Sequence, residues 1–180
     1  MSAQVRKPQP RTTGSMISVV RRLDGLDKSK LVNLSVNENA WGTAPGAEKA
    51  AIAAMADARL YADTGAWALR AAIGGYYNLD PACVVPGNGS EEILDIVGRV
   101  YARPGDEILA PALSFAQFRI VAWRLGVDYV ESPVIGQMDV DVEALIAAVT
   151  PRTRVIYLAN PGNPTGRGLD SAALLRLADA

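Results

Sequence analysis

The sequence predicts an α/β fold with a mostly parallel sheet flanked by helices, and three observations support it. From residue 83 onward, short apolar runs alternate with helical stretches, the pattern of strands joined by crossover helices. Turns rich in Pro and Gly separate these segments. Hydrophobic residues make up 49% and charged residues 21% of the 180 residues, which is the balance of a soluble globular protein.

The first third of the chain is predicted to hold a tail and two helices. Residues 1–30 are interpreted as a tail and an entry arm, disordered at the start, with a short amphipathic helix over 15–26. Residues 31–36 are expected to be extended. The Ala-rich segment 46–58 favours a helix. A second helix is expected to begin at a capping Asp63 or Thr64 and to end near Tyr77.

The remaining elements alternate along the chain. We expect strands at 83–85, 107–110, 127–130 and 154–159, and helices at 91–101, 114–125, 142–149 and from 170 onward. Gly126 is expected to stop one helix, and Asp141 is expected to cap another. No internal repeat interrupts this order.

Composition excludes several classes of function. The chain has no histidine, so it contains neither Ser-His-Asp or Cys-His catalytic groups nor a His-ligated zinc site. Its one cysteine, Cys83, allows no internal disulfide and no multi-Cys metal site, which fits a reducing compartment. The net charge of -1 argues against nucleic acid and anionic membranes as partners. The sequence has neither a membrane-length apolar run nor, at residues 1–14, the apolar core of a secretory signal.

Two loops follow predicted strands and lead toward helices, the position at which parallel sheets bind ligands. Gly87-Asn88-Gly89-Ser90 places glycines before a helix start, where free N–H groups suit a phosphate. The same residues are also compatible with a plain turn that has Ser90 as the helix cap and Glu91 or Glu92 complementing the helix dipole.

The second loop, Asn160–Gly166, contains two prolines and two glycines that fix the path of the chain. We expect the amides of Asn160 and Asn163 to be held facing the ligand, where they could donate to a phenolate or carboxylate. The alternative is a rigid loop with asparagines in turn positions.

The chain resembles the fold-type-I pyridoxal-phosphate aminotransferases of class I/II, most closely the histidinol-phosphate aminotransferases. The resemblance covers about residues 31–180 and rests on pieces in the family's order: Asn37-Glu38-Asn39 with Trp41-Gly42; Tyr61 through Leu69-Arg70; Gly87 through Glu92; Pro104-Gly105-Asp106; and Asn160-Pro161-Gly162-Asn163-Pro164-Thr165-Gly166. It implies an aspartate-aminotransferase-like large domain that binds pyridoxal 5'-phosphate. The implied domains are the 1–30 arm and the N-terminal part of this large domain at 31–180.

The resemblance also implies roles for individual residues. The backbone N–H groups of Gly89, Ser90 and Glu91 match the turn that holds the cofactor phosphate. Phe115 matches the aromatic residue that stacks on the pyridine ring, although composition alone favours a core aromatic on an amphipathic helix. Asn163 matches the asparagine that hydrogen-bonds the phenolic oxygen of the cofactor.

Two further matches concern the substrate and the assembly. Tyr61 matches a tyrosine that reaches the cofactor phosphate of the neighbouring subunit, which implies a homodimer with shared active sites. Asn37, Glu38 and Asn39 match the strip that closes over the substrate. The implied reaction is a cytoplasmic amino transfer in histidine biosynthesis, between an amino donor such as histidinol phosphate and a 2-oxo acid, 2-oxoglutarate.

The family's catalytic lysine, which forms the Schiff base, lies beyond the Asn160–Gly166 loop, whereas the four lysines here precede residue 50. We therefore predict that the chain is the N-terminal part of a longer protein and is inactive alone, with no catalytic residue and no metal site of its own. Two alternatives remain open. One is an aromatic aminotransferase or a threonine-phosphate decarboxylase-like enzyme. The other is a non-catalytic module that binds a phosphate ligand or a partner chain.

Overall fold

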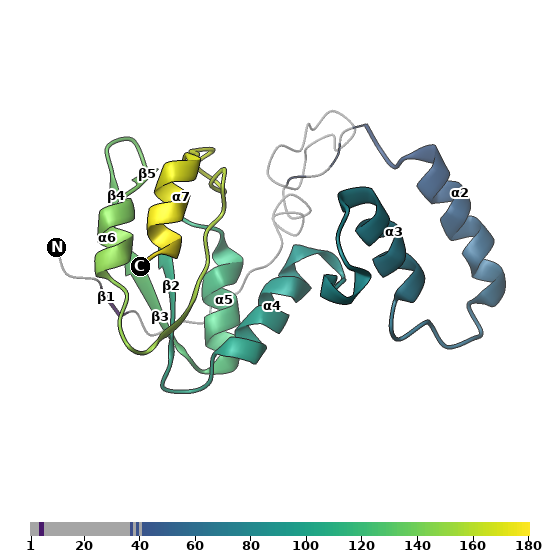
Figure 1. The fold of residues 1–180 in the computed structure, drawn as a ribbon, viewed down its shortest axis with the longest axis horizontal. Helices are drawn as coiled ribbons and strands as arrows, with labels where there is room; N and C mark the ends of the chain where they lie inside the picture. The colour runs from purple at the N-terminus through teal and green to yellow at the C-terminus, as the bar shows by residue number, and fades with distance from the viewer. Residues whose placement is uncertain (1–3, 6–36, 38, 40) are drawn as a thin grey trace, which may run out of the picture. The chain divides into compact units, whose positions relative to one another are not determined.

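The computed structural model describes residues 4–5, 37, 39 and 41–180 (Figure 1). The chain divides into two compact units. Pro10–Val84 forms the first, here called the helical unit, and Val85–Ala180 with Met1–Gln9 forms the second, here called the sheet unit. None of the helices in the described part of the chain is long and apolar enough to cross a membrane.

The helical unit contains α2 (Pro45–Ala54), the 3-10 turn η2 (Met55–Asp57), α3 (Trp67–Tyr77) and a second 3-10 turn, η3 (Pro81–Cys83). Both predicted helices are confirmed. The second helix begins later than expected, at Trp67, and its cap residue is Ala66 and not Asp63 or Thr64. The Asp63 carboxylate nevertheless accepts hydrogen bonds from the N–H groups of Gly65 (3.0 Å) and Trp67 (2.7 Å), so it satisfies donors just before and at the start of α3.

The prediction of a strand at 83–85 is wrong. The Asp80 carboxylate accepts from the Ala82 N–H at 2.8 Å, and Pro81 begins a 3-10 turn that includes Cys83. Val84 is extended (φ -100°, ψ 122°), but no described strand pairs with it. A capping aspartate followed by proline therefore outweighs the β-propensity of two valines that lack a neighbouring strand.

The sheet unit is built on three parallel strands, β2 (Glu107–Pro111), β3 (Asp128–Ser132) and β6 (Thr153–Ile156). The strand order is β1-β3-β2-β6, with β1 (Gln4–Val5) antiparallel to β3. Pairing of β1 differs from the disordered start expected from the polar sequence. β6 is shorter than predicted because the backbone leaves the ladder after Tyr157, whose N–H still donates to Leu109.

The helices of the sheet unit are α4 (Gly89–Tyr101), α5 (Ala116–Leu125), α6 (Val142–Ala147) and α7 (Ser171–Ala178). Gly126 ends α5 in the left-handed conformation (φ 66°), and Asp141 and Asp170 cap α6 and α7. A short hairpin of β4 (Val134–Ile135) and β5 (Asp139–Val140), which the sequence did not predict, precedes α6.

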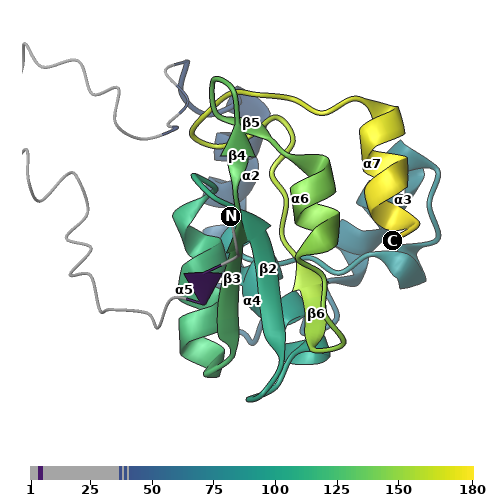
Figure 2. The same cartoon turned by 90° about the vertical axis from the view of Figure 1, so that its left-hand side faces the viewer.

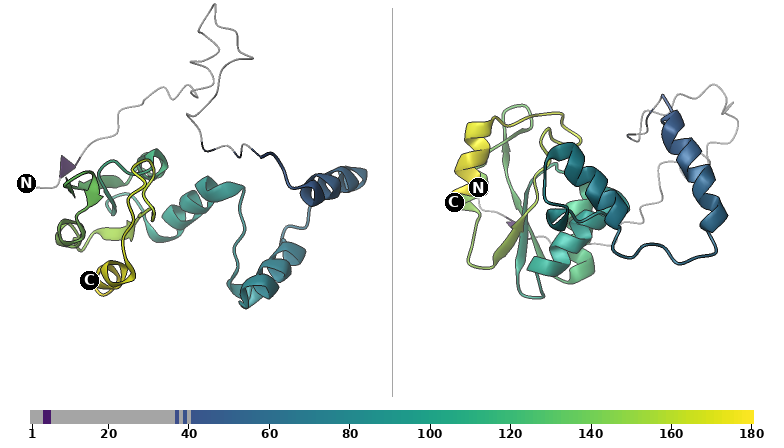
Figure 3. Two further views of the ribbon diagram at one scale, coloured as in Figure 1. Left: turned by 90° about the horizontal axis from the view of Figure 1, so that it is seen from above. Right: turned by 45° about the vertical axis from the view of Figure 1, so that its right-hand side comes forward.

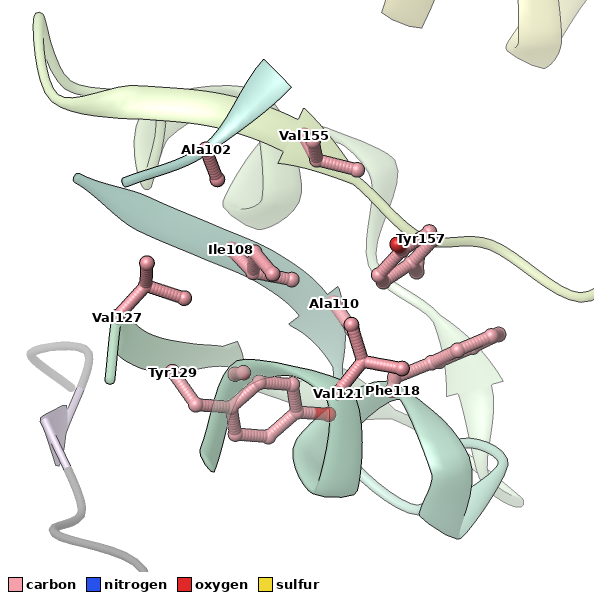
Figure 4. Packing of buried hydrophobic residues seen from close by; sticks show 10 residues of the cluster. Ala102, Ile108, Ala110, Phe118, Val121, Val127, Tyr129, Val155 and Tyr157 are labelled. Atoms are coloured by element: carbon pink, nitrogen blue, oxygen red, sulfur yellow. The ribbon is translucent and has the colours of Figure 1, made fainter. Parts of the chain in front are cut away.

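The two faces of the sheet are covered by different helix pairs (Figures 2 and 3). On one face α4 and α5 bury Ile108, Ala110 and Tyr129 in a cluster that includes stacked Phe118 and Tyr157 (Figure 4). On the other face α6 and α7 pack on Leu109 and Val130. Because both faces are covered, the central strand β2 is buried along its whole length, as expected inside a parallel sheet.

Charged side chains gather at the amino ends of the parallel strands. Glu107, at 3% exposure, accepts hydrogen bonds from the Arg152 guanidinium and from the Thr150 hydroxyl (2.6 Å). Arg152 also donates to Asp128 at 2.9 Å. The guanidinium therefore neutralises a buried carboxylate and links the starts of the strands.

Arg152→Met is expected to lower the free energy of unfolding by about 2–3 kcal/mol, because it leaves the buried Glu107 carboxylate without its charged donor. Urea denaturation measures the change. The matched control is Arg176→Met, since Arg176 pairs with Glu143 at 3.4 Å on the surface. In the control variant the free energy of unfolding is expected to fall by less than about 0.5 kcal/mol. Equal losses in the two variants would contradict the assignment.

Candidate functional site

The sheet unit has a topological switch point between β2 and β6. From β2 the chain passes through α5 on one face of the sheet to β3, and then through α6 on the other face to β6, on the far side of β2. The loops after the neighbouring strands β2 and β6 therefore lead to opposite faces of the sheet. At such a point the carboxyl edge of a parallel sheet is the usual place for a ligand.

Helix α4 begins at this same edge. Tyr157, directly after β6, donates its hydroxyl hydrogen to the carbonyl of Leu94 in α4. Gln117, in the first turn of α5, donates to the Glu91 carboxylate at 2.6 Å. These bonds hold the first half of α4 beside the residues that follow β2 and β6. The Gly87–Ser90 and Asn160–Gly166 loops thus lie at one edge of the sheet, as the resemblance implies.

The start of α4 offers two backbone donors. Its cap residue is Asn88, whose side chain makes no capping bond, and Ser90 is the second helical residue. The alternative with Ser90 as the cap is therefore wrong. The N–H groups of Ser90 and Glu91 have no acceptor among the described residues. Free N–H groups and the helix dipole together favour an anion here.

Two features keep this turn open to an anion. Gly89 has a left-handed backbone (φ 76°), and a side chain added there would meet no atom within 4 Å, so the space beside it is open. Of the two acidic side chains in the first turn, Glu91 is directed toward α5, where it accepts from Gln117, whereas Glu92 bonds back to the turn and accepts from the Asn88 N–H. The turn therefore fits the phosphate of pyridoxal phosphate.

Phe115 lies between β2 and α5, at the same edge. It is the residue before the first turn of α5, is half-buried, and packs edge-to-face on Phe118 at 5.9 Å between ring centroids. Phe118 in turn stacks on Tyr157 at 5.0 Å. Phe115 is thus both a partner of the core and a ring at the candidate site, so its two predicted roles are compatible.

The two asparagines of the Asn160–Gly166 loop differ in the hydrogen bonds of their side chains. The Asn160 amide donates to the Leu169 carbonyl (3.1 Å) and accepts from the Leu169 N–H (2.8 Å). The prediction that Asn160 faces a ligand is therefore wrong, because both ends of its amide bond within the loop. Asn163 is half-buried, and its side chain makes no hydrogen bond to any described residue. Its amide is available to a ligand.

The remaining predicted site residues belong to the helical unit. Tyr61 is fully exposed. Asn37 is exposed, and Asn39 forms a local turn by donating to the Gly42 carbonyl at 2.7 Å. Glu38 lies outside the described residues. The roles predicted for these residues stay predictions. In the described part of the chain, no cluster of three or more potential metal ligands is present.

Sequence reasoning missed Tyr157 and Gln117, which connect the loops of the site. In the sequence, Tyr157 looks like one more apolar residue of a strand, and Gln117 looks like a polar residue on an amphipathic helix. A phenol within an otherwise aliphatic strand end was the available signal for Tyr157, because buried hydroxyl groups need a hydrogen-bond partner. No local signal marked Gln117, since its partner lies 26 residues away.

The buried phenol of Tyr157 makes stability dependent on pH. Burial raises its pKa from 10.0 to about 12, the backbone N–H of Gly98 opposes this shift, and the charge of Asp95 adds to it. Between pH 10 and 12 the unfolded phenol ionises while the folded one stays neutral. The free energy of unfolding is therefore expected to fall as pH rises through this window.

The free energy of unfolding of the Tyr157→Phe variant is expected to fall less steeply with pH over the same window, because phenylalanine has no proton to release on unfolding. Tyr129, whose pKa burial also raises to about 12, stays in the variant and retains part of the slope. Urea denaturation at several pH values between 10 and 12 measures both slopes. Identical slopes would show that Tyr157 is not protected from ionisation in the folded protein.

Comparison with known proteins agrees with this geometry. The family model described as aminotransferase class I and II matches residues 29–180. The chain is 46% identical over 152 residues to the histidinol-phosphate aminotransferase of Zymomonas mobilis, covering 84% of this chain and 41% of the relative. It is 47% identical over 163 residues to the enzyme of the same name from Sphingopyxis alaskensis, covering 88% and 43%.

Solved structures show the same fold. The histidinol-phosphate aminotransferase from Sinorhizobium meliloti, in complex with pyridoxal-5'-phosphate, has a TM-score of 0.74 and 27% identity over 80% of this chain and 39% of that chain. The enzyme from Clostridium acetobutylicum has a TM-score of 0.70 and 26% identity over 83% and 43%. The chain thus spans about two fifths of the length of the relatives it matches. With its family model matched over residues 29–180, the chain belongs to the class I and II aminotransferases.

Proposed function

We propose that this chain supplies the pyridoxal-phosphate-binding part of an aminotransferase that moves the amino group of histidinol phosphate to 2-oxoglutarate. The relatives named histidinol-phosphate aminotransferase support the substrate. One observation carries the proposal. In a chain of this family, two free N–H groups at the start of α4 lie at the same sheet edge as the loop of Asn163, whose amide has no partner among the described residues.

Each residue of the site has a distinct task in this proposal. The N–H groups of Ser90 and Glu91 bind the phosphate, and Gly89 leaves room for it. Phe115 stacks on the ring and orients it, a contact worth about 0.5–1.5 kcal/mol beyond its buried area. The Asn163 amide donates to the phenolic oxygen. When bound, pyridoxal phosphate supplies the electron-withdrawing ring that stabilises a substrate carbanion.

The proposal extends to the assembly of the complete enzyme. We propose a cytoplasmic homodimer in which Tyr61 reaches the phosphate bound by the partner subunit. Asn37, Glu38 and Asn39 would lie on the substrate side. Because the resemblance assigns the cofactor-anchoring lysine to none of the four lysines here, the 180-residue chain by itself is expected to bind the cofactor without catalysing transfer.

The proposal is tested by titrating the 180-residue chain with pyridoxal phosphate, reducing the mixture with borohydride and mapping modified peptides by mass spectrometry. Saturable binding at one site is expected, without a stoichiometric adduct on Lys7, Lys28, Lys30 or Lys49. A stoichiometric adduct on one of these lysines would contradict the anchoring assignment. Absence of binding would refute the cofactor site, and binding of inorganic phosphate alone would favour the non-catalytic phosphate module.

A further inference from the structure

Gln117 connects the two turns to which the proposed function gives separate tasks. It lies in the first turn of α5, two residues after Phe115, and its Nε2 donates to Oε1 of Glu91 at 2.6 Å. Glu91 is the third residue of α4, and its N–H is one of the two free donors. One side-chain hydrogen bond therefore joins the anion-binding turn to the turn that carries the aromatic ring.

The orientation of the Gln117 amide follows from its partner. A carboxylate can only accept, so the NH₂ end of the amide must face Glu91. The other end, Oε1, is buried and has no hydrogen-bond partner among the described residues. The bond to Glu91 is thus the polar contact that fixes this side chain, and a charged acceptor makes it a strong one.

The packing of α4 on α5 does not by itself fix their first turns. The two helices pack closely in their second halves, where a side chain added at Gly98 would lie 2.8 Å from methyl groups of both Val121 and Leu125. The Gln117–Glu91 bond is at the opposite ends of the same helices. Two separated contacts fix the rotation of one helix on the other, which a single contact leaves free.

We propose that Gln117 is a positioning residue for the cofactor: through Glu91 it sets the distance between the anion-binding N–H groups and the ring of Phe115. The inference rests on the proposed function. A phosphorylated ring held at both ends needs this distance to be fixed, because a stacking contact weakens when the rings are displaced. Inorganic phosphate, which occupies only the α4 turn, does not need it.

The experiment compares three variants of the 180-residue chain with the unsubstituted chain. Gln117→Leu removes the bond, Gln117→Glu places two carboxylates together, and the double variant Glu91→Gln with Gln117→Glu exchanges the donor and the acceptor. Affinities for pyridoxal phosphate and for inorganic phosphate are measured separately by fluorescence titration. The induced circular dichroism of bound pyridoxal phosphate reports the orientation of its ring, and Arg124→Leu, at the far end of α5, is the control.

Gln117→Leu is expected to weaken pyridoxal phosphate binding by about tenfold, the loss of one hydrogen bond to a charged group, and to reduce the induced dichroism. Its affinity for inorganic phosphate is expected to stay close to that of the unsubstituted chain. Gln117→Glu is expected to lose more affinity for pyridoxal phosphate than Gln117→Leu. The double variant with exchanged donor and acceptor is expected to recover most of the affinity and of the induced dichroism. The exchanged pair keeps the inference testable if Gln117→Leu does not fold.

Two results would overturn the inference alone. One is a Gln117→Leu chain that binds pyridoxal phosphate with unchanged affinity and dichroism. The other is an exchanged pair no better than Gln117→Glu. Failure of the unsubstituted chain to bind pyridoxal phosphate overturns the proposed function and the inference with it.

Discussion

Ser90→Pro is expected to weaken the binding of pyridoxal phosphate and of inorganic phosphate to the chain by about 10- to 100-fold, the range for one hydrogen bond to a charged group. The substitution deletes a single backbone donor, since proline has no N–H. Proline is tolerated in the first turn of a helix, where the N–H has no partner within the helix. Fluorescence titration measures the loss.

Position 90 is better suited than position 91 to a test in which proline removes one backbone donor, because of the backbone conformation of the preceding residue. Proline restricts the residue before it, and Gly89 already has a non-helical backbone with φ 76°. Glu91→Pro would instead strain Ser90, which is helical. The control is Ser90→Ala, which keeps the N–H and removes only the hydroxyl, and which is expected to lose far less affinity. Equal losses for proline and alanine would show that the hydroxyl, and not the backbone, binds the anion.

Leu109→Ala is expected to lower the free energy of unfolding by about 3–4 kcal/mol, the cost of lost apolar burial plus the cavity left behind. Leu109 is fully buried at the centre of β2 and packs on Val130, Leu145 and Leu177 beneath α6 and α7. Urea denaturation of the 180-residue chain measures the loss. If the variant is unfolded in water, Leu109→Met, which nearly conserves volume, is expected to lose under about 1.5 kcal/mol.

The matched control for this substitution is Leu175→Ala in α7. Leu175 is 64% exposed, so its removal is expected to change the free energy of unfolding by less than about 0.5 kcal/mol. A similar loss in the two variants would mean that the face of the sheet beneath α6 and α7 is not the core that the packing indicates.

Most of the sheet unit could be predicted because its signals are local. Asp141 and Asp170 precede apolar helical runs and accept from the backbone N–H three residues on, at 3.0 and 2.7 Å. Gly126 stops α5 because it adopts a left-handed backbone without a steric penalty. Such capping rules depend on a few neighbouring residues and therefore can be applied to a sequence without coordinates.

The errors arose where an outcome depends on distant partners. The Val84 segment has β-propensity but no described strand beside it, and propensity alone does not form a ladder. Asn160 and Asn163 occupy similar positions in one loop, yet Asn160 is held by Leu169, nine residues on, and Asn163 is not. Which asparagine side chain is left without a partner is decided by the return of the chain after Gly166, which the loop sequence does not reveal.

The candidate site shows the same division. The glycine turn before α4, to which we assign the phosphate, was predictable because glycines before a helix start are a local motif. Its connection to Phe115 was not, because the Gln117–Glu91 bond depends on α4 and α5 lying side by side. The resemblance to a family supplied the order of the motifs, whereas the hydrogen bonds that join them required coordinates.

The weak pairing of β1 with β3 has a consequence for the aggregation of this protein. Strand β1 is two residues long and pairs antiparallel with β3, with Val5 opposite Val130. The paired residues are far apart in the sequence, so bringing them together is entropically costly, and so short a strand makes few hydrogen bonds to offset the cost. Mild warming should therefore release β1 well before the sheet melts. The edge of β3 would then be exposed and could pair with a strand of a neighbouring molecule. At high protein concentration, aggregation is therefore expected at a lower temperature than unfolding of the sheet.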